Sequence, residues 1–311
     1  MSKYTILDAD EGMWLEQELE AMKTRELDVK YPDLMGRRLF PVDATTNEGA
    51  ESVAYRSFDA VGVAKLIANG AKDLPSVNVK SKKSVKQLYS IGDSFEYTQA
   101  DIRAARMSGM PLDSKLLSAA RRAAMVVEDD LIFFGDADVG YNGIVNHPNI
   151  GTLTAPDGAG GTTDWASKTS LEIVNDINLA VSQIVDGSNG VEAPTTMALP
   201  TAQYALIAQT PMSADNNVTI LKFVLESNPY INEIVPVYKL KDSIAASASY
   251  DSEDCAVFYN RSIDKLWIEL PMEFRAYTAQ EQGLSLVVPC EQRTGGLTIA
   301  YPLSVCRLDG I

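Results

Sequence analysis

The sequence predicts a fold of the α+β class, in which helical and strand-like stretches are largely separate along the chain. Apolar residues recur at steps of three and four over residues 113–134, as they do on one face of a long helix. Residues 52–98 instead alternate between apolar and polar side chains, which is typical of antiparallel strands. Residues 265–308 are almost wholly strand-like. Together these three observations indicate an α+β arrangement.

The composition is that of an ordinary globular protein. The 311 residues can bury a sizeable core, in two domains or in one elaborated domain. The formal net charge of −15 predicts that most of the surface repels phosphates, so such a protein could enclose DNA without gripping it. The sequence contains no run of about 18 apolar residues, so we expect no membrane span.

The first residues and the cysteines indicate a cytoplasmic place of synthesis. Residues 1–10 lack the apolar segment of a secretory signal. Cys255, Cys290 and Cys306 are odd in number and show no C-x-x-C spacing. We therefore expect reduced thiols rather than a disulfide framework or a zinc site.

Residues 1–50 are predicted to form an N-terminal arm. An acidic, helix-compatible stretch covers residues 8–27, and the pairs Tyr31-Pro32 and Phe40-Pro41 then favour extended backbone. Because this long stretch precedes the first strand pattern, we expect the arm to lie on another surface. A helix packed in the core is the alternative.

Residues 51–95 are predicted to form an extended, cationic β-hairpin. One strand pattern runs from Val53 to Leu66 and a second from Val77 to Phe95, with a turn-rich tip between them. On so acidic a chain, the natural partner of a cationic hairpin is another copy. The alternatives are lysines that protect an exposed edge from aggregation and a phosphate contact, which the lack of interleaved aromatic residues makes weaker. The lysines are Lys65, Lys72, Lys80, Lys82, Lys83 and Lys86.

The long helix over residues 113–134 is predicted to begin at a capping Asp113 and to end before Gly135. Glu128, Asp129 and Asp130 lie at the end whose dipole favours cations, so we expect a positive group nearby. The alternative is a solvated acidic face with local counterions. The predicted apolar stripe consists of Leu116, Ala120, Ala123, Val127, Leu131 and Phe134.

The remainder is predicted to alternate helices and strands and then to end in strands. Thr98 can cap a short helix, and residues 151–163 form a glycine- and threonine-rich loop. Residues 293–308 resemble one long strand, with a possible bulge at Gly295-Gly296. Helices are expected at 170–185 and 218–226, the first with Leu171, Val174, Ile177, Val181 and Ile184 on one face, and strands at 195–200, 233–240 and 255–260.

Residues able to carry catalysis are sparse. His147 is the one histidine, it lies in a turn signal, and no Gly-x-Ser-x-Gly elbow presents a nucleophile. Asp136, Asp138 and Asn142 resemble a calcium loop but lack its distal glutamate. We therefore expect no catalytic, cofactor-binding or metal-binding residues, although a soluble α/β enzyme with an unfamiliar site stays a less favoured alternative.

The order of these parts is similar to that of the major capsid proteins of tailed double-stranded DNA phages, which have the Hong Kong 97 fold shared with encapsulin shells. The most telling segments are Leu131-Ile-Phe-Phe-Gly-Asp with the following Tyr141-Asn-Gly-Ile-Val, the strand-to-helix step from Met197 to Ile207, and the closing strands. The resemblance extends over most of the chain.

The resemblance implies a role for each section. Residues 1–50 would be the arm, 51–95 the extended loop over an adjacent subunit, and 96–168 a peripheral domain with its spine helix. Residues 169–264 would form the axial domain, and 265–311 would return to the periphery. Lys80, Lys82, Lys83 or Lys86 of one subunit would then approach Glu128, Asp129 or Asp130 of another.

The resemblance also implies a structural protein of the virion. Pentamers and hexamers would assemble into an icosahedral head that encloses DNA without specific binding, and scaffold, portal or decoration proteins are possible partners. Relatives often begin with a cleaved scaffolding helix, which this N-terminus is too short to contain. The alternative is an encapsulin-like compartment that holds a cargo enzyme.

Overall fold

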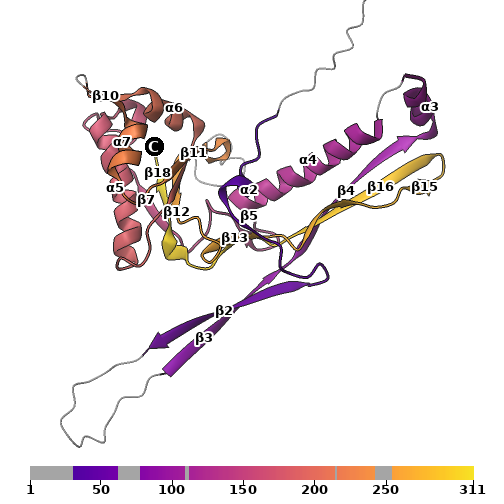
Figure 1. Ribbon diagram of the computed structural model, residues 1–311, viewed down its shortest axis with the longest axis horizontal. Helices are drawn as coiled ribbons and strands as arrows, with labels where there is room; N and C mark the ends of the chain where they lie inside the picture. The colour runs from indigo at the N-terminus through magenta and orange to yellow at the C-terminus, as the bar shows by residue number, and fades with distance from the viewer. Residues whose placement is uncertain (1–30, 62–77, 109–111, 214–215, 242–253) are drawn as a thin grey trace, which may run out of the picture. The chain divides into compact units, whose positions relative to one another are not determined.

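The computed structural model describes residues 31–61, 78–108, 112–213, 216–241 and 254–311. The chain divides into two compact units, Met1–Asp33 and Leu34–Ile311. Of the first unit only residues 31–33 are described, so the elements labelled in Figure 1 belong to the second unit. Among the described residues, no helix is long and apolar enough to cross a membrane.

A five-stranded sheet forms the centre of the α/β part of the second unit. Its strand order is β11 (Glu233–Pro236), β8 (Thr196–Leu199), β12 (Cys255–Tyr259), β18 (Val305–Asp309) and β7 (Gly151–Thr154). β8 is parallel to β11 and antiparallel to β12, and β18 is parallel to β7. Figure 1 shows three helices beside this sheet: α5 (Ser170–Gly187), α6 (Thr201–Gln209) and α7 (Ile220–Ser227).

The central strand β12 is buried on both faces of this sheet, and its successive side chains point to opposite faces. Ala256 and Phe258 of β12 pack in one apolar cluster with residues of the three helices. Cys255, Val257 and Tyr259 of the same strand pack in a second cluster, with Phe40 and the end of the long helix. The sheet therefore joins the helical layer to the rest of the unit.

Helix α5 begins where its capping residues predict. The carboxylate of Glu172 accepts a hydrogen bond from the backbone N–H of Thr169 at 2.7 Å, as in a capping box. Four of the five predicted stripe residues are buried, but Leu171 is 70% exposed. Leu171 lies in the first turn at the edge of the stripe, where the helix has turned it away from the sheet.

Two smaller sheets lie beside the long helix α4 (Leu112–Phe133). β16 (Ser285–Thr294) pairs with β4 (Tyr89–Thr98), β14 (Met272–Ala276) and β15 (Gln280–Gln282). β13 (Leu266–Glu269) pairs with β17 (Gly296–Ile299) and, in parallel, with β1 (Val42–Asp43). The short elements are α2 (Gly36–Leu39), α3 (Gln99–Ser108), β5 (Gly135–Asp136), β6 (Tyr141–Asn142), β9 (Pro211–Ser213) and β10 (Asn216–Thr219).

The buried face of α4 differs from the predicted stripe. Ala123 and Val127 are exposed, whereas Ala124 and Glu128, one position further along, are buried. The physical reason is that the Glu128 carboxylate has hydrogen-bond partners inside the protein. Glu128 therefore faces inward, where the apolar pattern predicted Val127. Asp113 is not an N-cap, because the helix already begins at Leu112.

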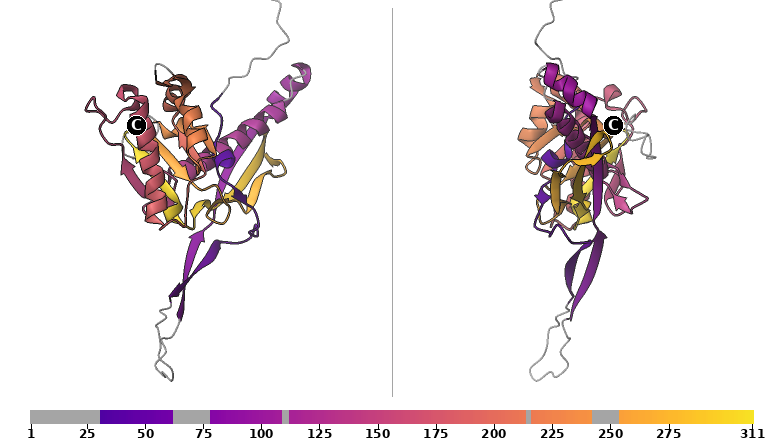
Figure 2. Two further views of the ribbon diagram at one scale, coloured as in Figure 1. Left: turned by 60° about the vertical axis from the view of Figure 1, so that its left-hand side comes forward. Right: turned by 90° about the vertical axis from the view of Figure 1, so that its right-hand side faces the viewer.

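The hairpin is present, but its second strand is shorter than predicted. β2 (Ser52–Val61) pairs antiparallel with β3 (Asn78–Gln87), and both views of Figure 2 show them extending away from the helices. Leu88, which is 6% exposed, separates β3 from β4, and β4 joins β16 instead. The predicted run from Val77 to Phe95 therefore belongs to two sheets. The predicted tip, with Lys65 and Lys72, lies outside the described residues.

The predicted single strand over residues 293–308 is also divided. Gly296 adopts a φ of 63°, which favours glycine, and the chain bends there between β16 and β17. A second turn at Pro302–Ser304 leads into β18, which pairs with β12 in the five-stranded sheet. The last strand thus lies beside strands of the predicted axial domain.

Part of the predicted arm packs within its own chain. Leu39 and Phe40 are each 1% exposed, and Val42 pairs with Ile268 of β13. Residues 1–30, which carry the predicted acidic helix, lie outside the described residues. The domain boundaries expected from the sequence stay a prediction.

Two glycines after α4 provide a matched pair of substitutions. Gly135 and Gly140 have φ angles of 68° and 74°, so alanine is strained at either position. A Cβ at Gly135 would also overlap the backbone carbonyl of Tyr141, whereas a Cβ at Gly140 would meet nothing within 4 Å. We expect Gly140→Ala to cost about 1 kcal/mol of unfolding free energy and Gly135→Ala at least about 2 kcal/mol more. Equal losses in urea unfolding would contradict this packing.

Candidate assembly site

The acidic end of α4 is mostly buried. Glu128 and Asp129 are only 1% and 5% exposed, whereas the side chain of Asp130 is 52% exposed. Removing a carboxylate from water is costly unless cations and hydrogen-bond donors replace the water. The structure supplies such groups from three other parts of the chain.

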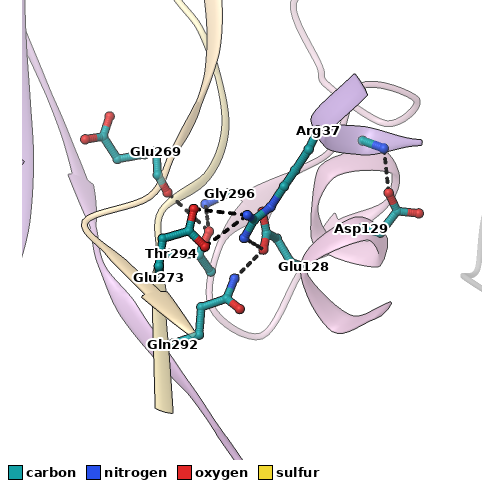
Figure 3. Close-up of polar contacts among 9 residues, drawn as sticks. Arg37, Glu128, Asp129, Glu269, Glu273, Gln292, Thr294 and Gly296 are labelled. Carbon is teal, nitrogen blue, oxygen red and sulfur yellow. Dashed lines mark hydrogen bonds and ion pairs between the residues drawn. The ribbon is translucent and has the colours of Figure 1, made fainter. Parts of the chain in front are cut away.

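Glu128 is held by a forked pair of hydrogen bonds from Arg37. Arg37 Nε donates to Glu128 Oε1 at 2.8 Å, and Nη2 donates to Oε2 at 2.7 Å (Figure 3). The amide of Gln292 in β16 also donates to Glu128 Oε2. Arg37 Nη1 reaches both oxygens of Glu273 in β14, at 3.0 and 3.1 Å. This cluster, here called the Arg37 anchor, joins α2, α4, β14 and β16.

Asp129 and Asp130 share a second cation. Lys239 Nζ lies 2.8 Å from Asp129 Oδ2 and 2.6 Å from Asp130 Oδ1. The backbone N–H of Gly36 donates to the other oxygen of Asp129 at 2.6 Å (Figure 3). Lys239 belongs to the turn that follows β11, so this ion pair ties the α/β part to the end of α4.

The electrostatics of the anchor favour the charged form of the Arg37 guanidinium. Burial opposes the charge on Arg37, but its hydrogen bonds to Glu128 and then to Glu273 raise the pKa of the guanidinium above its ordinary value. A bidentate Arg–carboxylate pair also fixes the relative orientation of both groups. The cluster is therefore a rigid joint.

The expected cations at the helix end are Arg37 and Lys239 of the same chain. The alternative of a solvated acidic face is wrong for Glu128 and Asp129, because both are buried against these partners. Among the three carboxylates, Asp130 retains an exposed side chain for a contact with another copy. The pairing with hairpin lysines of a neighbouring subunit stays a prediction.

The four described hairpin lysines have different surroundings. Lys80, Lys82 and Lys83 are exposed along β3. Lys86 instead bends onto the body of the unit, where its Nζ donates to the carbonyl of Leu297 at 2.6 Å and lies 5.0 Å from the centroid of the Tyr141 ring. Burial lowers the pKa of Lys86 to about 8. Lys86 thus fastens the base of the hairpin.

The residues considered for catalysis are not brought together. His147 Nδ1 accepts a hydrogen bond from the backbone of Asn149 at 3.3 Å, and burial, with the nearby charge of Lys86, lowers the pKa of its imidazole. The three thiols are buried, and burial raises the pKa of Cys306 to about 12. Among the described residues, no group of His, Cys, Asp and Glu could hold a metal ion.

Sequence reasoning missed Arg37, Lys239 and Gln292. Arg37 lies 91 residues before Glu128, and Gln292 lies 164 residues after it. Helix-dipole reasoning indicated a cation but could not say which one. The Arg37-Arg38 pair in the predicted arm was the available signal, because two adjacent arginines form a local cationic cluster.

Comparisons with known proteins agree with one another. A family model described as major capsid protein matches residues 62–311. The structure is similar to the capsid of Myoviridae phage XM1, with a TM-score of 0.82 at 14% identity over 99% of this chain and 100% of the other. A subunit of Mycobacterium phage Bobi gives a TM-score of 0.66 at 11% identity, over 97% and 99% of the two chains.

A curated relative extends the comparison to a second kind of shell. The chain is 31% identical over 152 residues to the type 1 encapsulin shell protein EncA of Myxococcus xanthus. This match covers 49% of this chain and 50% of the relative, so it spans about half the length of that protein.

Removing the cation of the anchor should be severely destabilising. Arg37→Met leaves the Glu128 carboxylate buried with Gln292 alone, and we expect a loss of about 3–5 kcal/mol in the free energy of urea unfolding. Glu128→Gln in the same chain should recover part of this loss. Lys222→Met is the control, because the Lys222–Glu226 pair is 64% exposed on both sides and should contribute less than about 0.5 kcal/mol. Similar losses for the two variants would contradict a buried anchor.

The buried lysine predicts a pH dependence of stability. The pKa of Lys86 is about 8 in the folded chain against 10.5 for a free lysine, so between these values the unfolded chain holds a proton that the folded chain has lost. Stability due to Lys86 therefore rises with pH across this window, by up to roughly 3 kcal/mol. From pH 7.5 to 11, the unfolding free energy of the wild type should therefore rise relative to that of Lys86→Met. Parallel profiles, as expected for Lys82→Met, would contradict the burial of Lys86.

Proposed function

The chain belongs to the major capsid protein family and has the Hong Kong 97-like fold of tailed-phage capsids, and from this premise we propose that its copies form the pentamers and hexamers of an icosahedral head around double-stranded DNA. The observation that carries the proposal is the agreement with a myovirus capsid subunit over nearly the whole of both chains. The chain would be synthesised in the bacterial cytoplasm and function in the virion as a structural protein.

The hairpin supports assembly with other copies. In the described part of the chain, β2 and β3 pair with each other and with no further strand. An isolated two-stranded hairpin is marginally stable in water. Phe58, Val79 and Val85 are 70%, 58% and 54% exposed on it. A neighbouring subunit that covers these side chains would stabilise both the hairpin and the shell.

The charge of the chain suits a container for DNA. A net charge of −15 repels phosphates, so a packaged genome would be confined without adhering to the wall. Many weak contacts between identical subunits can still add up to a stable closed shell, because each subunit is held by several neighbours at once.

An encapsulin-like compartment is the second candidate function. The observation that favours it is the 31% identity with EncA, although that match covers about half of each chain. A cargo protein would then occupy the interior in place of DNA.

The content of native particles separates these two functions. Particles that contain the chain are purified from the bacterial culture that produces them naturally. They are treated with nuclease, and the protected nucleic acid and protein are then extracted. We expect protected double-stranded DNA of uniform length. Nucleic-acid-free shells with one co-purifying protein at a constant ratio would favour the compartment, and a chain found only as a small soluble oligomer would contradict both.

The exposed hairpin lysines should take part in assembly. Reversal of all three charges, in Lys80→Glu, Lys82→Glu and Lys83→Glu together, should prevent closed particles without changing urea unfolding of the subunit. Asp130→Lys should partly restore assembly if Asp130 is the neighbour's contact. Lys222→Glu, a reversal of another exposed lysine, is the control. Normal particles from the triple variant, seen by electron microscopy, would contradict the proposed contact.

A further inference from the structure

A surface cavity of about 170 Å³ lies at the base of the hairpin. Tyr55 and Ser84 line it from the hairpin, Asn142 and His147 from the segment after α4, and Thr298 from β17. Lys86 also lines it, at the point where β3 approaches the body of the unit.

The charge in this cavity is not neutralised within the described residues. Lys86 Nζ contacts a carbonyl, the hydroxyl of Thr298 at 3.4 Å and the face of Tyr141, but no described carboxylate lies within ion-pair distance. Glu269 is the acid that influences it from further away. The oxygens of Glu269 already accept hydrogen bonds from Thr46 and from Trp267, the latter at 2.8 Å. A partly buried cation without an anion is costly, so the cavity favours an anionic occupant.

The rest of the lining suits the same occupant. Asn142, Ser84, Tyr55 and Thr298 carry amide or hydroxyl donors, and none of the lining residues is acidic. Hydrogen-bond donors around one ammonium group are the surroundings that a carboxylate requires. The volume is sufficient for a side-chain carboxylate.

We propose that this cavity binds a carboxylate, supplied in the shell by an aspartate or glutamate side chain of a neighbouring copy. The chain offers 42 acidic residues against 27 lysines and arginines, so a neighbour's surface is rich in such groups. The cavity lies at the base of the hairpin, whose exposed apolar residues would also be covered by a neighbouring copy under the proposed function. That the carboxylate comes from a neighbouring copy rests on the proposed function. That the cavity binds a carboxylate does not.

A bound carboxylate and burial under a neutral surface shift the pKa of Lys86 in opposite directions. An anion beside the ammonium raises its pKa, whereas cover by a neutral surface lowers it further. The pKa of Lys86 is measured by trace acetylation at a series of pH values with mass spectrometry, on dissociated subunits and on closed particles. The exposed Lys222 serves as the internal reference. A separate series on dissociated subunits compares sodium acetate with sodium chloride at equal ionic strength.

The proposal predicts that the pKa of Lys86 rises by at least about one pH unit on assembly and also rises with acetate. Asn142→Asp places a carboxylate in the lining and should abolish the acetate response. An unchanged or lower pKa in particles would overturn the neighbour as occupant. No response of the Lys86 pKa to acetate would overturn the carboxylate site itself. The acetate series uses dissociated subunits, so it tests the site even if no particles form. A failure to form particles would count against the proposed function alone.

Discussion

The buried ion pair between Arg37 and Glu128 is the interaction on which the arrangement of this chain depends. Glu128 lies inside the packed face of α4, and its charge is tolerated because a bidentate guanidinium and an amide replace water. Those partners come from α2 and from β16, at opposite ends of the sequence. Once the pair forms, the segment before β1, the long helix and the last long strand are fixed in one place.

Buried contacts between distant segments also distinguish the packed part of the second unit from the hairpin. The centre of the five-stranded sheet is buried on both faces, and the turn carrying Lys239 connects it to the helix end. Among its described residues the hairpin belongs to no comparable apolar cluster, and contacts of Lys86, Tyr141 and the Tyr55–Trp267 ring pair hold its base. The chain thus combines a well-packed core with an extended hairpin that exposes apolar residues. This combination suits a shell subunit, because the hairpin is available for contact with a neighbouring copy.

Local pattern predicted the elements whose stability is local. The long helix, helix α5 and the pairing of the hairpin strands all follow from residues close together in sequence. The break at Leu88 was missed, and a bend at Gly295-Gly296 was expected only as a bulge within one strand, because both breaks depend on which distant strand each segment joins. The Arg37 anchor was missed for the same reason. A glutamate within a helix is assigned to solvent unless its distant partner is known, so the predicted stripe placed Val127 where Glu128 lies.

The most direct test of this account is an electron cryomicroscopy map of closed particles of the chain, at a resolution that shows side chains. The account predicts that β2 and β3 lie on a neighbouring subunit, which covers Phe58 and Val85, while the Arg37–Glu128 pair stays within each subunit. A hairpin folded back on its own subunit, or an Arg37 that pairs across the interface, would contradict it.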